Sequence, residues 1–153
     1  MQRISLSILL LIFSCEKTVE PEDCAGYFDF EQSDLQAPYY FIDVKIENIS
    51  IEEEDWVVAF NGDICVGARK GWGNTELCGG GICEVMAMGN SGQDETIGYC
   101  NPGDIPTFKI YDVSEGIIYN TTTTDTIPSW EYDNSSIIVS TLMATDIYVS
   151  NCQ

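Results

Sequence analysis

The sequence contains no histidine and few basic residues. Its 153 residues include 25 Asp and Glu but only 6 Lys and Arg, which gives a formal net charge of −19 at pH 7. Without imidazole, the chain cannot build a Ser-His-Asp or Cys-His catalytic arrangement or a histidine-ligated zinc site. A surface this acidic also repels phosphate backbones, which excludes nucleic acid as a partner.

Sustained helical periodicity is absent as well, and the N-terminal apolar stretch is short. Residues 4–13 are mostly apolar, but a helix that spans a bilayer needs about 20 such residues. The stretch follows Arg3 and precedes Ser14 and Cys15. A positive charge, a short apolar core and a small residue at the end are typical of an export signal.

Residues 12–15, Ile-Phe-Ser-Cys, resemble the lipobox of bacterial lipoproteins. The acidic stretch after Cys15 resembles the surface-export signals of Bacteroidota lipoproteins. The resemblance implies cleavage before Cys15, a lipid on its side chain and a location at the outer membrane or cell surface. It divides the chain into a signal peptide (1–14), a lipidated tether (15–26) and one domain (27–153). A conventional cleaved signal peptide is the alternative.

The number of cysteines agrees with a lipidated Cys15. The chain has seven cysteines, and an odd number in an oxidising compartment needs an explanation. If Cys15 carries lipid, the other six can form three disulfides. We expect Cys78 to pair with Cys83 across a short glycine-rich loop. The weaker expectations are Cys24 with Cys152, which would tie the ends of the domain together, and by elimination Cys65 with Cys100. Structural zinc is the rival interpretation, but CGGGIC has no second matched cysteine pair.

The strongest local signal is a hairpin over residues 56–70, WVVAFNGDICVGARK. Two apolar runs flank Asn61-Gly62, which favours a two-residue type I′ turn. In that register Val57, Ala59, Ile64, Val66 and Ala68 share one face, and Trp56, Val58, Phe60, Cys65 and Gly67 share the other. Both faces are apolar, so the hairpin should lie inside a sandwich or under a long loop. The same register pairs Glu54 with Arg69 and Glu53 with Lys70.

Further short runs of alternating apolar residues follow at intervals along the chain, with turn residues between them. The expected strands outside the hairpin are residues 39–46, 83–88, 107–113, 117–120, 137–142 and 146–149. Residues 121–126, a threonine run, are either an exposed strand or a glycan-bearing stretch. This pattern predicts an all-β domain, an antiparallel β-sandwich of Ig-like or jelly-roll topology supported by disulfides.

Several ordered motifs together resemble a module of large secreted proteins from marine bacteria. They are AFNGDICVGARK, CGGGIC, MGNSGQDETIGY and GDIPTFKIYD, and the resemblance covers residues 30–142. Here Gly71 separates Lys70 from Trp72, where the module more often has Trp directly, and the chain carries a single copy. The resemblance implies an extracellular, non-catalytic domain and says almost nothing about a ligand.

Three aromatic residues in expected loops are candidate ligand-binding positions: Trp72, Trp130 and Tyr132. Aromatic rings in loops can stack on the apolar faces of sugars, although each ring could equally pack over the end of the sandwich. Residues 90–95, NSGQDE, are the only faint calcium-loop signal, and they lack EF-hand spacing. We therefore expect no cofactor, with calcium left open.

These features favour a non-catalytic binding or adhesion module at the cell surface, with carbohydrate as its ligand and a lipid anchor in the membrane. A surface protein is the other partner considered. The alternative function is a structural or pilin-like assembly subunit, in which residues 137–149 act as a donor strand. A glycosidase using two carboxylates is disfavoured, because no motif marks a nucleophile among so many acids.

Overall fold

The computed structural model describes residues 27–72, 74, 76, 78, 82–132 and 137–150, with only the backbone for 137–140 and 149–150. The elements are β1 (Gln36–Ile46), β2 (Ile49–Ser50), β3 (Trp56–Asn61), β4 (Ile64–Lys70), β5 (Cys83–Met88), the 3₁₀ turn η3 (Asp94–Thr96), β6 (Thr107–Asp112), β7 (Ile117–Thr123) and β8 (Ile137–Ser150). The all-β prediction is confirmed. Within the described ranges, no helix is long and apolar enough to cross a bilayer.

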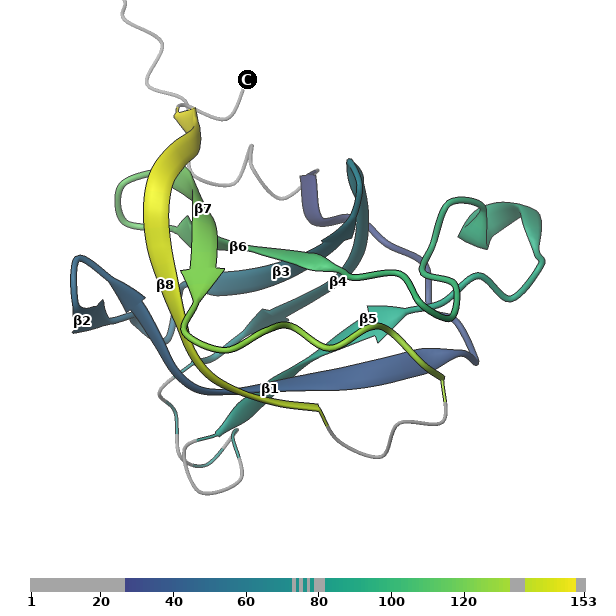
Figure 1. Ribbon diagram of the computed structural model, residues 1–153. Coiled ribbons are helices and arrows are strands. Elements are labelled where there is room, and N and C mark those ends of the chain that lie inside the picture. Colours follow the sequence, from purple (N-terminus) through teal and green to yellow (C-terminus); the bar gives the residue numbers. More distant parts are fainter. Residues whose placement is uncertain are drawn as a thin grey trace, which may run out of the picture.

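All eight strands belong to one sheet that curls on itself (Figure 1). The strand order is β2-β1-β8-β7-β6-β3-β4. β5 is off this path and pairs with residues 36–41 of β1, whereas β2 pairs with residues 45–46 of β1. The curl brings β4 at the far end back against β5, where a Cβ on Gly67 would clash with the carbonyl oxygen of Met86. The expected sandwich of two stacked sheets is therefore not confirmed, because a single curled sheet encloses the core.

The last strand, β8, lies in the middle of the sheet. Figure 1 shows it as the long curved strand that begins beside β1 and ends beside β7. It pairs in parallel with β1 and antiparallel with β7. The sequence predicts two short strands here, residues 137–142 and 146–149. The structure joins them into one strand with register irregularities against β7, because such bulges allow a strand to bend without ending.

The central hairpin forms, but its turn lies one residue later than expected. Asn61 pairs with Ile64, so the loop is Gly62-Asp63, and Gly62 has a positive φ of 61°. Asn61 stays in β3, where its side-chain amide donates to the carbonyl oxygen of Gly98 at 3.0 Å. A bulge beyond Ala59 then shifts the register again, so that Ala59 pairs with Gly67.

Because of the shifted register, the predicted faces are right for some hairpin residues and wrong for those that follow the bulge. Val57, Ala59 and Val66 lie on one face as predicted, and Val58, Phe60 and Cys65 lie on the other. Ala68, which was predicted on the first face, lies on the second face with Val58 and Phe60. Gly67, which was predicted on the second face, lies on the face that packs against β5. Arg69 and Lys70 both form ion pairs, but not with the predicted Glu54 and Glu53, respectively. Arg69 contacts Glu84 at 3.1 Å, and Lys70 contacts Glu54 at 2.5 Å.

Both apolar faces of the hairpin are covered, as its composition requires. The inner cluster lies within the curl and includes Tyr39, Phe41, Ile110 and Leu142. The outer cluster lies on the opposite face of β3 and β4, where Phe28 covers Val58, Phe60 and Cys65 together with Tyr111 and Ile118. The Phe28 ring lies 5.3 Å from that of Tyr111. The N-terminal segment of the domain is therefore the loop that shields the outer face.

One hairpin was missed in the sequence. Ile46 pairs with Ile49, which leaves Glu47 and Asn48 as a two-residue turn with φ values of 49° and 67°. Positive φ at both central positions is the geometry that Asn tolerates best among non-glycine residues. Asn48 was the available signal, but no glycine follows it.

Candidate functional site

Two of the three candidate aromatic residues belong to the core. Trp72 is 4% exposed, packs near the Phe41 ring and donates its indole N–H to the carbonyl oxygen of Arg69 at 2.9 Å. Trp130 is fully buried and donates its indole N–H to the carbonyl oxygen of Ala87 at 2.8 Å. The prediction that these rings bind a ligand is wrong, because a buried indole whose polar atom is satisfied presents no face to a sugar.

Tyr132 is the one predicted aromatic residue that is exposed, with 58% of its surface accessible. It lies after Trp130, whose backbone N–H and carbonyl are held by Asp104 and Gly103. A single exposed ring does not define a site, since isolated surface aromatics are common.

The cysteines divide into three groups. Cys78 and Cys83 form the predicted disulfide. Cys65 and Cys100 are buried free thiols, so the prediction that they pair is wrong. Cys65 faces the outer cluster and Cys100 the inner one, which places their side chains on different faces of the fold. Cys15, Cys24 and Cys152, with the predicted lipidation and the third disulfide, lie outside the described residues.

Burial makes both free thiols poor nucleophiles. Desolvation raises the pKa of Cys65 to about 11 and that of Cys100 to about 12. A thiol with so high a pKa stays protonated at neutral pH, and the thiolate is the reactive species. These two cysteines are therefore packing residues and not candidates for catalysis.

Residues 90–95 form a compact turn. The side-chain oxygen of Asn90 accepts from the N–H of Gly92 at 2.9 Å, and the hydroxyl of Thr96 accepts from the N–H of Ser91 at 3.1 Å. Within the described part of the chain, no three cysteine, aspartate or glutamate side chains gather closely enough to hold a metal ion. The turn is held by hydrogen bonds to its own side chains.

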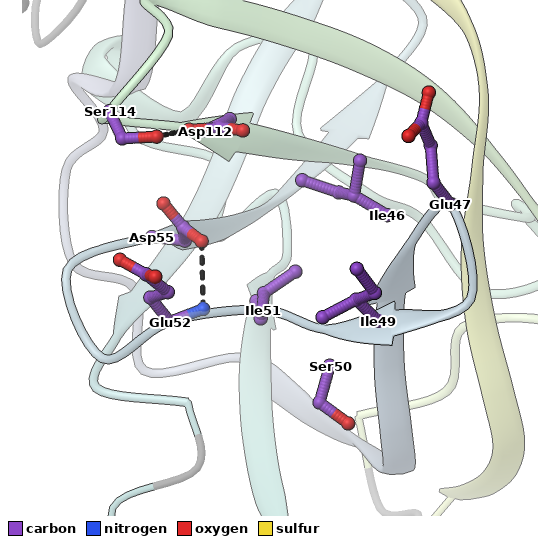
Figure 2. Close-up of a pocket in the computed structure, with 9 residues that line it drawn as sticks. All are labelled: Ile46, Glu47, Ile49, Ser50, Ile51, Glu52, Asp55, Asp112 and Ser114. Atoms are coloured by element: carbon purple, nitrogen blue, oxygen red, sulfur yellow. Dashed lines mark hydrogen bonds between the residues drawn. The ribbon is translucent and has the colours of Figure 1, made fainter.

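In the described part of the chain, two hollows are considered as candidate sites, and the smaller of the two is lined by acids and isoleucines (Figure 2). It has a volume of about 170 Å³ and lies between the β1–β2 turn and the start of β3. Asp55, 4% exposed, accepts backbone N–H groups from Glu52 at 2.8 Å and from Val113 at 3.0 Å. Desolvation nevertheless raises the pKa of Asp55. Its carboxylate joins two loops and has a structural role.

The larger hollow is a groove of about 360 Å³ where β6 and β7 separate. The two strands pair only between residues 109–112 and 117–120. Beyond that point β6 continues along β3, and β7 continues along β8. The groove therefore opens in a gap within the sheet, which we call the threonine groove.

The threonine groove is lined mainly by hydroxyl, amide and charged side chains over a small apolar floor. Its lining residues are Thr107, Phe108, Lys109, Asn120, Thr121, Thr122, Thr123, Ile127, Thr145 and Asp146. Thr121 bridges the gap, since its hydroxyl donates to the carbonyl oxygen of Phe108 at 2.6 Å. Hydroxyl groups act as both donors and acceptors, so the groove can bind a ligand with many hydroxyl groups.

At the closed end of the groove, three polar side chains from three strands form a chain of hydrogen bonds. The Nζ atom of Lys109 on β6 donates to Oδ1 of Asn120 on β7 at 3.1 Å. The Nδ2 atom of Asn120 donates to Oδ2 of Asp146 on β8 at 2.9 Å. Hydrogen bonds from Asn120 and Thr145 lower the pKa of Asp146, which keeps it ionised.

The sequence does not predict this arrangement. The residues are separated by up to 37 positions, and no motif joins them. The only usable signal was the alternation of residues 107–112, which sets Lys109 opposite to the inward Phe108 and Ile110. The partners on β7 and β8 depend on strand pairing.

No family model, curated protein or solved structure matches the chain. Its class therefore follows from its own residues and geometry: an all-β domain built on one curled sheet, with a polar groove in a gap between two strands.

Proposed function

We propose that the chain is a non-catalytic binding module that holds a neutral carbohydrate in the threonine groove. The observation that carries this proposal is the lining of the groove, where several threonine hydroxyls and an amide lie beside apolar surface that includes Ile127. Sugars combine ring hydroxyls with apolar C–H faces, and binding sites of this kind match both with a few convergent polar groups over apolar surface.

The charge of the chain restricts the ligand further. With a net charge of −19, the protein repels sulfated and uronic polysaccharides, and Lys109 is the only cation in the groove lining. A neutral polysaccharide or oligosaccharide avoids this repulsion. The ligand class is therefore an uncharged glycan.

The proposed location is outside the cytoplasm, at the cell surface, with a lipid on Cys15 as the anchor. The Cys78–Cys83 disulfide supports an oxidising compartment, because disulfides are rare in proteins kept in reducing cytosol. A binding module fixed in this way would retain a glycan near the cell without altering it.

The alternative, assembly by strand exchange, is less well supported. In this fold β8 pairs with β1 on one side and β7 on the other, so donating it to a neighbour would break two ladders at once. Size-exclusion chromatography of the unlipidated chain distinguishes the two, since an assembly subunit forms concentration-dependent oligomers and a binding module elutes as a monomer.

The binding test uses the full chain with Cys15→Ser, screened against neutral and anionic glycans and then titrated by calorimetry. Thr107→Val and Thr122→Val each remove a groove hydroxyl while preserving shape. Loss of one hydrogen bond should weaken binding by about 5- to 10-fold. Thr126→Val, an exposed threonine outside the groove, is the matched control and should bind like the parent. Equal binding by all three variants would refute the groove as the site.

A further inference from the structure

The hydrogen bonds among Lys109, Asn120 and Asp146 also bring three reactive groups into contact. Lys109 and Asn120 are direct cross-strand partners on β6 and β7. Their reactive groups, an amine and a carboxamide, are already in contact, with Nζ 3.1 Å from Oδ1. On the other side of the amide, Asp146 is 2.9 Å from Nδ2. An amine, an amide carbonyl and a carboxylate are thus aligned in that order.

Two aromatic rings lie near the amine. The Nζ atom of Lys109 lies 3.6 Å from the centroid of the Tyr148 ring and 5.3 Å from that of Phe60. Partial desolvation lowers the pKa of Lys109 despite the opposing effects of Asp63 and Asp146. A larger share of neutral amine follows, and the neutral form is the nucleophile.

We propose that Lys109 and Asn120 become joined by an intramolecular amide bond between Nζ and Cγ, with release of ammonia. In this step the lone pair of the neutral amine attacks Cγ of Asn120, and a new C–N bond forms. The bond between Cγ and Nδ2 then breaks, and Nδ2 leaves as ammonia. One amide replaces another, so the reaction needs no oxidant, reductant or cofactor.

Asp146 is placed to move the proton that this exchange requires. The attacking nitrogen must lose one proton, and the leaving nitrogen must gain one. Once Nζ is bonded to Cγ, both nitrogens are on the carbon beside the carboxylate. The ionised carboxylate, which already accepts from Nδ2, can therefore take the proton from Nζ and deliver it to Nδ2 as the Cγ–Nδ2 bond breaks. Holding the three groups in contact replaces a reaction between separate molecules, which is worth several orders of magnitude in rate.

The position of the bond gives it a structural effect. Lys109 and Asn120 form the last β6–β7 pair before the two strands separate at the threonine groove. A covalent bond there would prevent the gap from extending along the hairpin. This effect does not depend on what the groove binds.

The test is the mass of the intact, reduced and denatured chain. We expect it to be lower than the sequence mass by one ammonia molecule, and to regain that mass in Lys109→Met. Trypsin should fail to cleave after Lys109. Glu-C, which cuts after Glu115 between the bonded residues, should leave the two fragments covalently joined. The joined fragments distinguish the bond from succinimide formation at an asparagine, which also releases ammonia.

Asp146→Asn tests the proton relay and should leave a mixture in which the unbonded mass predominates. Its folding is checked by far-ultraviolet circular dichroism, and the parent measurement stands whether or not this variant folds. The proposal is overturned if the parent chain has its full sequence mass and trypsin cleaves after Lys109. Glycan binding is measured separately, so its loss or retention does not affect this result.

Discussion

Replacing Trp130 tests most directly whether its ring is a core element or a ligand platform. The side chain is fully buried, and its indole N–H donates to the carbonyl oxygen of Ala87 at 2.8 Å. The ring also packs so closely on Gly89 that a Cβ there would overlap it. A substitution at Trp130 should therefore act on stability.

The magnitude follows from burial and from the hydrogen bond. Removing a buried tryptophan side chain costs roughly 3–5 kcal/mol, and the lost hydrogen bond adds about 1 kcal/mol. Domains of this size have roughly 5–15 kcal/mol of total stability, so Trp130→Ala could unfold the chain. Trp130→Phe keeps most of the apolar volume, and we expect it to lower the free energy of unfolding by about 2 kcal/mol.

Urea denaturation followed by far-ultraviolet circular dichroism measures this change, with the midpoint falling and the slope unchanged. The control is Tyr132→Phe, at an exposed aromatic position, which should stay within about 0.5 kcal/mol of the parent. If Trp130→Phe leaves the midpoint in place but abolishes glycan binding, the ring is a ligand contact and the reasoning from burial is refuted.

Four further outcomes are expected. Replacing Cys78 and Cys83 together by alanine should lower stability by about 2 kcal/mol in urea denaturation, because the disulfide closes a short loop; an unchanged midpoint would contradict this. Gly67→Ala should lower the free energy of unfolding by about 1–3 kcal/mol in urea denaturation, since its methyl group would meet a β5 carbonyl. A stabilised variant would mean that β4 and β5 do not approach each other. Cys65 and Cys100 should resist maleimide labelling at pH 8 until urea is added. Burial raises the pKa of Cys65 to about 11 from an ordinary value of about 8.5, so between these pH values the folded state binds more protons than the unfolded state. The free energy of unfolding should therefore fall as the pH rises from about 8.5 to about 11. Cys65→Ser should make this pH dependence weaker.

The hairpin illustrates how far sequence reasoning extends. Its two apolar faces and its tight turn were predicted from residues 56–70 alone, since alternation and a glycine are local features. The register was wrong by one residue at the turn, because Asn61 binds Gly98, a residue 37 positions away. The bulge after Ala59 then moved Ala68 to the opposite face.

The candidate aromatic residues also show that local sequence does not determine burial. Trp72 and Trp130 lie outside the strands, which favoured exposure. Each is nevertheless buried in the inner cluster, because the segment that carries it packs back onto the sheet. A residue's neighbours in the sequence do not reveal whether a loop turns inward.

By itself, the sequence determined the strand-forming runs, the acidic charge and the short Cys78–Cys83 loop, since each depends on residues close together in the chain. Only the tertiary structure decided the threonine groove and the contact between Lys109, Asn120 and Asp146. Those features arise where β6, β7 and β8 meet and separate. The physical reason is that strand pairing and bulges place distant residues within a few ångströms, and no local pattern records that placement.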